Sequence, residues 1–342
     1  MASEAPPFWW EKPDWRSFVL SPFSAIYAAV AGRRLHRAPR KKIPVPVLCV
    51  GNFTVGGTGK TPIAIALAGQ ARQMGFSPGI LSRGHGGGFS GPHIVDVNRD
   101  SAKHVGDEPL LLAAHAPVAV SVNRVAGAQL LLEGQGCDFL IMDDGFQSAH
   151  LHIDYALMVV DAHFGLGNGR VIPGGPLRAK VVDQLVYSHA LLRMGKGAGA
   201  DSVVRQVARA GKPVFDAWVR PYDAENFSGR RFLAFSGIGH PEKFFNTLAE
   251  TGAKVVTTQS FPDHHFYAED ELNELLRQAK AGQLELITTA KDAVRLRHGA
   301  AAPEFLEKLK VLEIETVFDQ PNVTARIIRE TVESWKRRRL IK

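Results

Sequence analysis

Short apolar runs alternate with longer amphipathic stretches along the chain from about residue 43 onward. Short apolar runs bounded by glycine or proline are typical of buried strands, whereas apolar positions three and four residues apart indicate helices. The strands expected from these runs include residues 43–50, 117–122, 155–161, 184–187, 215–219, 231–235, 254–258, 284–288 and 310–316. The helices expected between them include residues 61–74, 110–114, 124–133, 268–281 and 322–335. The alternation predicts an α/β protein.

The same pattern divides the chain into parts. Strands and helices alternate through residues 43–220, a polar connection follows at 221–229, and a new strand–helix series begins at Arg231. A length of 342 residues is enough for two domains that each have a core. We therefore expect an N-terminal segment of residues 1–42 and domains at 43–220 and 221–342. The C-terminal helix could pack back on the first domain.

The first 42 residues combine aromatic, apolar and basic segments. Three tryptophans lie within residues 9–15, residues 17–31 carry no charge, and six Lys or Arg residues follow between 33 and 42. This order is typical of a membrane-interface anchor, although the uncharged run is shorter than the ~20 residues that a straight span needs. An amphipathic helix packed on the protein's own core is the alternative. A cleaved signal peptide is disfavoured because the positive charge follows the apolar run.

Composition narrows the function classes. Lys and Arg outnumber Asp and Glu by 41 to 34, and the net charge of +7 suits an anionic partner such as a nucleotide, nucleic acid or membrane surface. The tryptophans cluster at the N-terminus and do not alternate with basic residues along a groove. This arrangement argues against a nucleic-acid-binding protein. The two cysteines, Cys49 and Cys137, do not form a metal-spaced pair. Their placement argues against disulfide scaffolds and zinc sites and favours a reducing compartment.

The most informative stretch is residues 47–62, where an apolar strand runs into a glycine-rich loop and the first turn of a helix. Backbone N–H groups of such a loop cradle phosphates, a lysine neutralises them, and a threonine hydroxyl binds Mg²⁺. Thr54 stands where the general spacing has glycine, and a turn that binds nothing is the alternative. The candidate nucleotide-binding residues are Gly56, Gly57, Thr58, Gly59, Lys60 and Thr61.

Carboxylates and imidazoles follow at three further places. Asp143 and Asp144 end an apolar strand, the expected position for residues that hold Mg²⁺ beside a phosphate loop. Asp107 and Glu108 begin a predicted helix, where carboxylates commonly cap free N–H groups. His264 lies in a Phe-Pro-Asp-His-His loop. For this loop acid–base chemistry and helix capping are alternatives, with a metal site ranked last.

The order of these motifs resembles the tetraacyldisaccharide 4′-kinase family over about residues 8–292. The chain departs from the family pattern at His85, Ser148, Ala179 and Ala290. The stretches that carry the resemblance are residues 51–62, Leu-Ser-Arg-Gly-His-Gly-Gly (81–87), Gly-Asp-Glu-Pro (106–109), Asp-Asp-Gly-Phe-Gln (143–147), Gly-Asn-Gly-Arg (167–170), Pro-Gly-Gly-Pro-Leu-Arg (173–178) and Phe-Pro-Asp-His-His (261–265).

This resemblance implies a fold and an activity. The fold is α/β, with a P-loop NTPase-like three-layer α/β/α domain, a second smaller α/β domain and an N-terminal membrane-associated helix. The activity is ATP- and Mg²⁺-dependent phosphorylation of the 4′-hydroxyl of a tetraacyldisaccharide 1-phosphate in lipid A (lipopolysaccharide) biosynthesis. The implied location is the cytoplasmic face of the bacterial inner membrane. The expected partners are the acylated disaccharide and that membrane surface, without nucleic acid or an obligate protein partner.

The resemblance also assigns roles by position. The catalytic residues would be Asp107 as general base, His264 as its partner, and Lys60. The function that competes with the lipid kinase is a phosphate-loop switch ATPase that drives a protein partner. Such an ATPase would not need Asp107 as a base. The Mg²⁺ ligands would be Thr61, Asp143, Asp144 and Glu108. The candidate substrate contacts are Arg83, Arg124, Gln147, Asn168, Arg170 and Arg178. Arg83, Arg170 and Arg178 are candidates because they lie in glycine-rich loops that follow strands, and solvated surface arginines are the alternative for these three.

Overall fold

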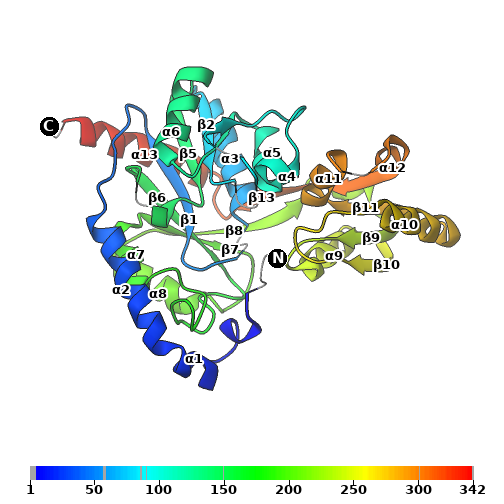
Figure 1. Ribbon diagram of the computed structural model, residues 1–342, viewed down its shortest axis with the longest axis horizontal. Coiled ribbons are helices and arrows are strands. Elements are labelled where there is room, and N and C mark those ends of the chain that lie inside the picture. Colours follow the sequence, from blue (N-terminus) through cyan, green and yellow to red (C-terminus); the bar gives the residue numbers. More distant parts are fainter. Residues whose placement is uncertain are drawn as a thin grey trace.

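Two separate β-sheets organise the molecule. The computed structural model describes residues 5–56, 59–84, 87–89, 91–148, 150–299 and 301–340. Within these residues the strands form one sheet of nine and one of four, so the protein is α/β, as the sequence pattern predicts. The two sheets lie in opposite halves of an elongated molecule (Figure 1).

The larger sheet is predominantly parallel. Its strand order is β13-β8-β7-β6-β1-β5-β2-β4-β3, and only the two edge pairs, β13 with β8 and β3 with β4, are antiparallel among the described pairings. The central strand β1 lies between β5 and β6. The strands are β1 (Val47–Asn52), β2 (Pro78–Ser82), β3 (His93–Ile94), β4 (Val118–Val120), β5 (Phe139–Asp143), β6 (Tyr155–Asp161), β7 (Ala190–Met194), β8 (Val214–Pro221) and β13 (Ile314–Phe318).

Helices cover both faces of this sheet. Successive residues of a strand point to opposite faces, so an apolar strand such as β1 places apolar side chains on both. Leu48 and Val50 pack on one face with α3, α5 and α13, while Val47 and Cys49 pack on the other with α2, α6, α7 and α8. This double burial explains why β1 is apolar from Val47 to Val50. The helices of this half are α1 (Trp15–Val19), α2 (Ser21–Arg37), α3 (Lys60–Gln73), α4 (Ala102–Val105), α5 (Asp107–Ala113), α6 (Arg124–Gln129), α7 (Val181–Tyr187), α8 (Asp201–Arg209) and α13 (Val323–Leu340).

The smaller sheet is parallel and has a core of its own. Its order is β10-β9-β11-β12. Phe235 packs on one face with α10 and α12, and Phe232 packs on the other with α9. The elements are β9 (Arg231–Ser236), α9 (Pro241–Glu250), β10 (Lys254–Ser260), α10 (Glu269–Gly282), β11 (Glu285–Thr289), α11 (Ala290–Arg297), α12 (Pro303–Lys308) and β12 (Leu309–Leu312).

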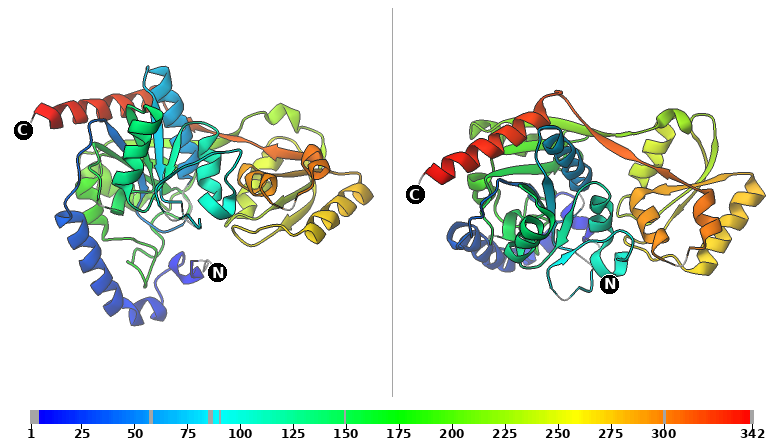
Figure 2. Two further views of the ribbon diagram at one scale, coloured as in Figure 1. Left: turned by 45° about the horizontal axis from the view of Figure 1, so that its top comes forward. Right: turned by 90° about the horizontal axis from the view of Figure 1, so that it is seen from above.

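Two expected strands are wrong. Residues 184–187 belong to helix α7, and the strand follows at β7. The apolar run was too short to distinguish a strand from a turn of helix. In α7 apolar side chains also lie on the exposed face, where Val182 and Val186 are found. Residues 310–316 form two strands, because the chain leaves the smaller sheet after β12 and joins the larger one as β13. Figure 2 follows this return along the chain into α13.

The C-terminal helix packs against the larger sheet. Ile327 and Ile328 are fully buried beside α3 and the sheet. Near its end, the Arg338 guanidinium donates to the buried Asp154 carboxylate, with Nε 2.7 Å from Oδ1. Asp154 in turn accepts from the N–H of Val47 at the start of β1. The last helix is therefore tied to the strand that leads into the glycine-rich loop.

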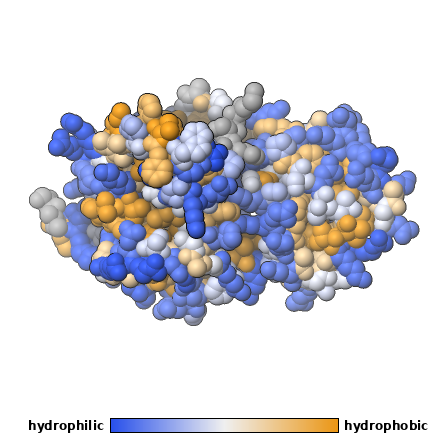
Figure 3. Space-filling view, turned by 90° about the horizontal axis from the view of Figure 1, so that it is seen from below, coloured by the Kyte–Doolittle hydropathy of each residue, from blue (hydrophilic) through white to orange (hydrophobic). Residues whose placement is uncertain are grey.

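The N-terminal helices leave an apolar face exposed. Helix α2 packs on α7 and the larger sheet through its own buried face, which includes Ala28 and Leu35. Apolar side chains are exposed on both halves of the molecule in the view of Figure 3, including the half that carries α1 and α2. None of the helices in the described residues is long and apolar enough to cross a membrane. We call the following exposed set the N-terminal apolar face: Trp15, Phe18, Val19, Phe23, Ile26 and Val30.

Candidate active site

The glycine-rich loop is held between the central strand and α3. Gly59 adopts φ +76° as the N-cap of α3, a left-handed conformation that a Cβ would strain. The loop is tied to residues 170–178, since Val55 donates its N–H to the carbonyl of Pro176 at 2.9 Å. Thr54, the residue that departs from the general spacing, forms a β-bridge with Leu177. Gly57 and Thr58 lie outside the described residues.

Lys60 and two aspartates meet at the end of the central strands. Asp143 is paired in register with Val50, so β5 delivers the carboxylates beside the loop. Lys60 Nζ lies 3.9 Å from Asp144 Oδ2. Arg178 holds the same carboxylate with both terminal nitrogens, at 2.7 and 2.9 Å. Thr61 is buried next to Lys60 in the first turn of α3.

The pKa values of the two aspartates are shifted in opposite directions. Burial raises the pKa of Asp143, and the neighbouring negative charge of Glu108 raises it further. Burial would also raise the pKa of Asp144, but the charges of Lys60 and Arg178 outweigh it and lower that pKa to about 2. Asp143 Oδ1 is buried without a hydrogen-bond partner among the described residues. A buried carboxylate in this state is a candidate for a cation ligand.

A carboxylate–imidazole pair joins the two halves. Asp107 begins α5 in the larger half, and His264 comes from the loop after β10 in the smaller half. His264 Nδ1 lies 3.2 Å from Asp107 Oδ2, which is the pairing that the family resemblance implies. Asp107 is only 5% exposed. Burial would raise its pKa, but the hydrogen bond with His264 and the charges of Lys291 and Arg295 hold that pKa well below its usual range.

A second ion pair crosses between the halves next to the first. Lys291, at the start of α11, places Nζ 2.5 Å from Glu108 Oε1. The charge of Lys291 lowers the pKa of Glu108. Arg295, one turn further along α11, is almost fully buried and places Nε 3.4 Å from Asp107 Oδ2. Two cations of α11 therefore face the two acids that begin α5.

Replacing Asp107 with asparagine is expected to lower the pKa of His264 toward its ordinary value. The hydrogen bond with Asp107 is the main cause that raises this pKa above 6.5 in the folded chain. A raised pKa means that the protonated imidazole stabilises the fold below pH 6.5, and this contribution is lost as pH rises through the folded value. An NMR titration of the His264 ring measures the change.

Asp263 provides the control for this titration. Its carboxylate lies 3.8 Å from His264 Nε2 but is much more exposed than Asp107. Asp263→Asn should change the His264 pKa less than Asp107→Asn does. An unchanged His264 titration in Asp107→Asn would contradict the pairing.

One cleft of about 2680 Å³ connects these groups. Its lining includes Tyr27 and Val30 of α2, Lys60 and Asp144 beside the phosphate loop, and His264 in the smaller half. Most of the predicted site residues line it. Those members are Gly56, Gly59, Lys60, Thr61, Arg83, Asp107, Glu108, Arg124, Asp143, Asp144, Gln147, Arg178 and His264.

Several predicted substrate contacts make internal bonds. The buried guanidinium of Arg124 donates to the carbonyls of Ser82 and Ser121. Gln147 accepts from Arg178 at 3.3 Å and donates to the carbonyl of Asn52 at 2.8 Å. Arg83 is exposed at the cleft. These contacts fix Arg124, Gln147 and Arg178 around Asp144 without a ligand.

Asn168 and Arg170 lie apart from the described lining of the cleft, against the N-terminal segment. Asn168 Nδ2 donates to Ser17 Oγ at 3.1 Å and to the carbonyl of Gly174 at 2.9 Å. The Arg170 guanidinium lies 4.4 Å from the centre of the Phe18 ring. In the structure these two side chains therefore anchor α1 to the loop that supports the phosphate loop.

Sequence reasoning missed three cations that join the smaller half to the acids of the larger half. Lys291 was visible only as part of Thr-Ala-Lys-Asp after a predicted strand, and Arg295 gave no local signal. Lys243 on α9 is a further case, since its Nζ lies 2.6 Å from Asp161 Oδ2 at the end of β6. All three cations belong to the smaller half and pair with acids of the larger half, so only tertiary structure reveals them.

Comparisons with known proteins agree with this geometry. The family model described as LpxK, tetraacyldisaccharide-1-P 4′-kinase, matches residues 16–333. The chain belongs to this family. A tetraacyldisaccharide 4′-kinase of Mesorhizobium japonicum is 66% identical over 340 residues, with 99% of each chain covered. One from Brucella melitensis is 55% identical over 339 residues, again covering 99% of both.

A solved LpxK structure supports the fold assignment. The structure of LpxK from Aquifex aeolicus in complex with ATP matches with a TM-score of 0.71 at 28% identity. The alignment covers 92% of this chain and 99% of that one. Membership in the LpxK family therefore extends to both sheets, since the match includes nearly the whole chain.

Proposed function

We propose that this chain transfers the γ-phosphate of ATP to the 4′-hydroxyl of a tetraacyldisaccharide 1-phosphate, a step of lipid A biosynthesis. The observation that carries the proposal is the single cleft that contains the phosphate loop, the Asp107–His264 pair and part of α2, including Tyr27 and Val30. The phosphate loop would bind a nucleotide, and the Asp107–His264 pair would act on a reacting hydroxyl. The apolar residues of α2 would contact an acyl chain. A switch ATPase would need only the phosphate loop.

The phosphate loop supplies nucleotide binding in this proposal. Backbone N–H groups at the start of α3 and the ammonium of Lys60 neutralise the phosphates. Lys60 is largely shielded from solvent, so its charge acts in a medium of low polarity. Arg178 holds Asp144 beside it, which keeps the carboxylate ionised and oriented.

Asp107 is the proposed general base. The hydroxyl oxygen of the sugar forms a bond to the γ-phosphorus, the bond from that phosphorus to ADP breaks, and the hydroxyl proton passes to Asp107. A carboxylate with a low pKa is a weak base, but phosphoryl transfer through a loose transition state depends mainly on positioning and charge neutralisation. His264 and Arg295 hold the carboxylate in place, at 3.2 and 3.4 Å.

The acidic residues beside the loop fit Mg²⁺. Thr61, Asp143, Asp144 and Glu108 offer the oxygen ligands that this ion prefers, and the buried Asp143 Oδ1 lacks a hydrogen-bond partner among the described atoms. When bound, Mg²⁺ would neutralise charge on the β- and γ-phosphates. Lys291 and Lys60 provide positive charge around the same carboxylates in the structure.

Two units joined by a hinge are a further part of the proposal. The smaller unit would begin near residue 221, as expected from the sequence, and would bring His264 and Lys291 to the acids of the larger one. Closure of two units over a substrate excludes water from the reaction. The boundaries matter for the chemistry because both ion pairs between α11 and α5 depend on this approach.

We also propose that the N-terminal apolar face rests on the cytoplasmic side of the inner membrane. Six large apolar side chains are exposed there, and α2 continues into the exposed basic residues Arg33, Arg34 and Arg37. Apolar burial combined with attraction to anionic lipid is typical of helices that lie in the interface. The same helix lines the cleft, so a substrate could pass from the membrane to the phosphate loop.

Replacing Phe23 and Ile26 together with glutamate is expected to reduce binding to vesicles that contain anionic lipid by at least about tenfold. Two exposed apolar side chains that would enter the membrane are lost, and two negative charges oppose the attraction to anionic lipid. Vesicle co-sedimentation measures this. Val256→Glu is the matched control, since Val256 is also an exposed apolar residue but lies on β10 in the smaller half. Equal losses in both proteins would contradict a specific membrane face.

A direct assay tests the function. The purified full chain, ATP, Mg²⁺ and a tetraacyldisaccharide 1-phosphate in detergent should yield the 4′-phosphorylated lipid, identified by mass spectrometry. ATP hydrolysis without phosphate on the lipid would overturn the kinase proposal and favour the switch ATPase.

A further inference from the structure

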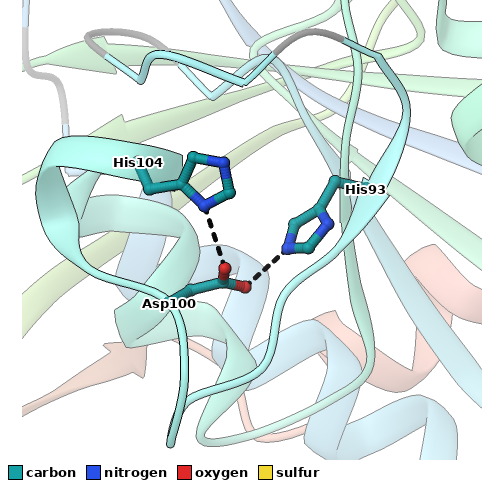
Figure 4. A group of neighbouring side chains, drawn as sticks. All are labelled: His93, Asp100 and His104. Atoms are coloured by element: carbon teal, nitrogen blue, oxygen red, sulfur yellow. Dashed lines mark hydrogen bonds and ion pairs between the residues drawn. The ribbon is translucent and has the colours of Figure 1, made fainter.

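A compact group of two histidines and one aspartate lies outside the candidate active site. His93 belongs to β3 at the edge of the larger sheet, Asp100 to the following turn, and His104 to α4. Asp100 lies between the two imidazole rings (Figure 4). Its Oδ2 is 2.6 Å from His93 Nε2, and its Oδ1 is 3.0 Å from His104 Nδ1.

The group is built by the backbone around it. Asp100 is buried, and its Oδ2 also accepts the N–H of Asp96 at 2.8 Å, which fixes the carboxylate. The rings of His93 and His104 are 5.3 Å apart at their centres. Both imidazoles are partly exposed while the carboxylate is not. The outer side of the group is therefore open to solvent and its inner side is held rigidly.

We propose that His93, Asp100 and His104 bind a divalent transition-metal ion. Two imidazoles and one carboxylate are ligands that suit Zn²⁺, so we expect the ion to be zinc. The two imidazole nitrogens and one carboxylate oxygen all lie within 4.8 Å of one another. Ligand atoms around tetrahedral zinc are about 3.3 Å apart, because each bond is about 2.0–2.2 Å long. Rotation of the two partly exposed rings would bring their nitrogens closer to that spacing. Water completes the fourth position on the open side.

The ligand set distinguishes this ion from the one proposed near the phosphate loop. Mg²⁺ prefers oxygen ligands in octahedral geometry, whereas imidazole nitrogen suits Zn²⁺. The cysteine spacing argues against zinc sites built from thiolates, but it does not address a site made of imidazole and carboxylate. All three ligands lie within residues 93–104. A bound ion would therefore join the two ends of this short segment.

The position of this segment suggests what the ion would do. Helix α4 leads through Gly106 directly into Asp107, the first residue of α5. An ion that joins β3 to α4 would restrain the segment in front of Asp107 and Glu108. This consequence for catalysis rests on the proposed function, whereas binding of the ion does not.

The alternative is a hydrogen-bonded group in which each imidazole donates an N–H to Asp100 and no ion binds. Zinc titration of the full, tag-free chain, stripped with a chelator, separates the two. Excess Mg²⁺ is kept present so that the carboxylates beside the phosphate loop are occupied. We expect one zinc ion per chain by calorimetry, and a cobalt spectrum with the visible bands of a nitrogen- and oxygen-ligated site.

His104→Gln and His93→Gln should each weaken zinc binding by more than the roughly 10–100-fold that loss of an outer-sphere partner costs. His115→Gln is the matched control, because His115 is an exposed histidine that lines the cleft but lies outside the group. Asp100→Asn, which keeps the side-chain shape, should also weaken binding. Retained ATP binding shows that the variants fold.

Two results would overturn the proposal. The first is the absence of saturable zinc binding to the wild-type chain in excess Mg²⁺. The second is zinc binding that His93→Gln and His104→Gln leave unchanged, which would place the ion elsewhere. Either result is independent of lipid phosphorylation, so it does not affect the proposed kinase activity.

Discussion

Asp107→Asn is expected to reduce kcat by about 10²–10⁴-fold, the usual contribution of a general base. Asparagine keeps the size of the side chain but cannot accept the hydroxyl proton. The carboxylate is buried between His264 and Arg295, so water cannot readily replace it as the proton acceptor. ATP binding should change little, because Asp107 is placed beside the reacting hydroxyl and not in the phosphate loop. Lipid phosphorylation at saturating ATP measures the first quantity, and nucleotide titration the second.

The matched control is Asp263→Asn. Asp263 lines the same cleft and also lies near His264, but it is exposed and does not contact Asp107 in the described structure. Its loss should alter kcat only slightly. Parallel decreases in turnover and ATP binding for Asp107→Asn would mean that the residue supports the fold of the site and does not act on the substrate.

Lys60→Ala is expected to lower kcat by about 10²–10³-fold, the cost typical of removing one electrostatic stabiliser of a transition state. Lys60 opens α3 and is the ammonium group that faces Asp144 from the phosphate loop. Its removal withdraws positive charge from the phosphates and from the buried acids together. Initial rates of lipid phosphorylation over a range of ATP concentrations measure the effect on kcat and KM separately.

Lys196→Ala is the comparison for charge alone. Lys196 also lines the cleft but is exposed in the turn after β7. Its removal should cost far less, because solvent screens an exposed charge. Similar losses for Lys60→Ala and Lys196→Ala would argue that general positive charge, and not the phosphate-loop position, supports the reaction.

Local sequence was sufficient where one segment contains the whole feature. The strand, glycine loop and helix around Lys60 were predicted because strand burial, glycine and helix onset follow each other within residues 47–74. Strand 155–161 was predicted with its bounds for the same reason. Residues 184–187 failed because four mostly apolar residues contain too little periodicity to separate strand from helix.

Features that depend on distant contacts could not be predicted from local patterns. The partners Lys291 and Glu108 are 183 residues apart, and the pair forms only because α11 and α5 face each other. The expected strand at 310–316 illustrates the same limit, since its two halves join different sheets. The pairing of His264 with Asp107 came from the family resemblance, because neither residue carries a local sign of the other.

The antiparallel pairing of β8 with β13 has a consequence for how the smaller sheet is attached. Pro221 and Ile314 are register partners, and the N–H of Tyr222 donates to the carbonyl of Glu313 at 2.9 Å. The chain therefore departs from the larger sheet and re-enters it at adjacent points. In topological terms, residues 222–313 form a cassette inserted at the tip of a β-hairpin. A short turn in place of the cassette would leave the nine-stranded sheet and its phosphate loop uninterrupted, but would remove His264, Lys291 and Arg295 together.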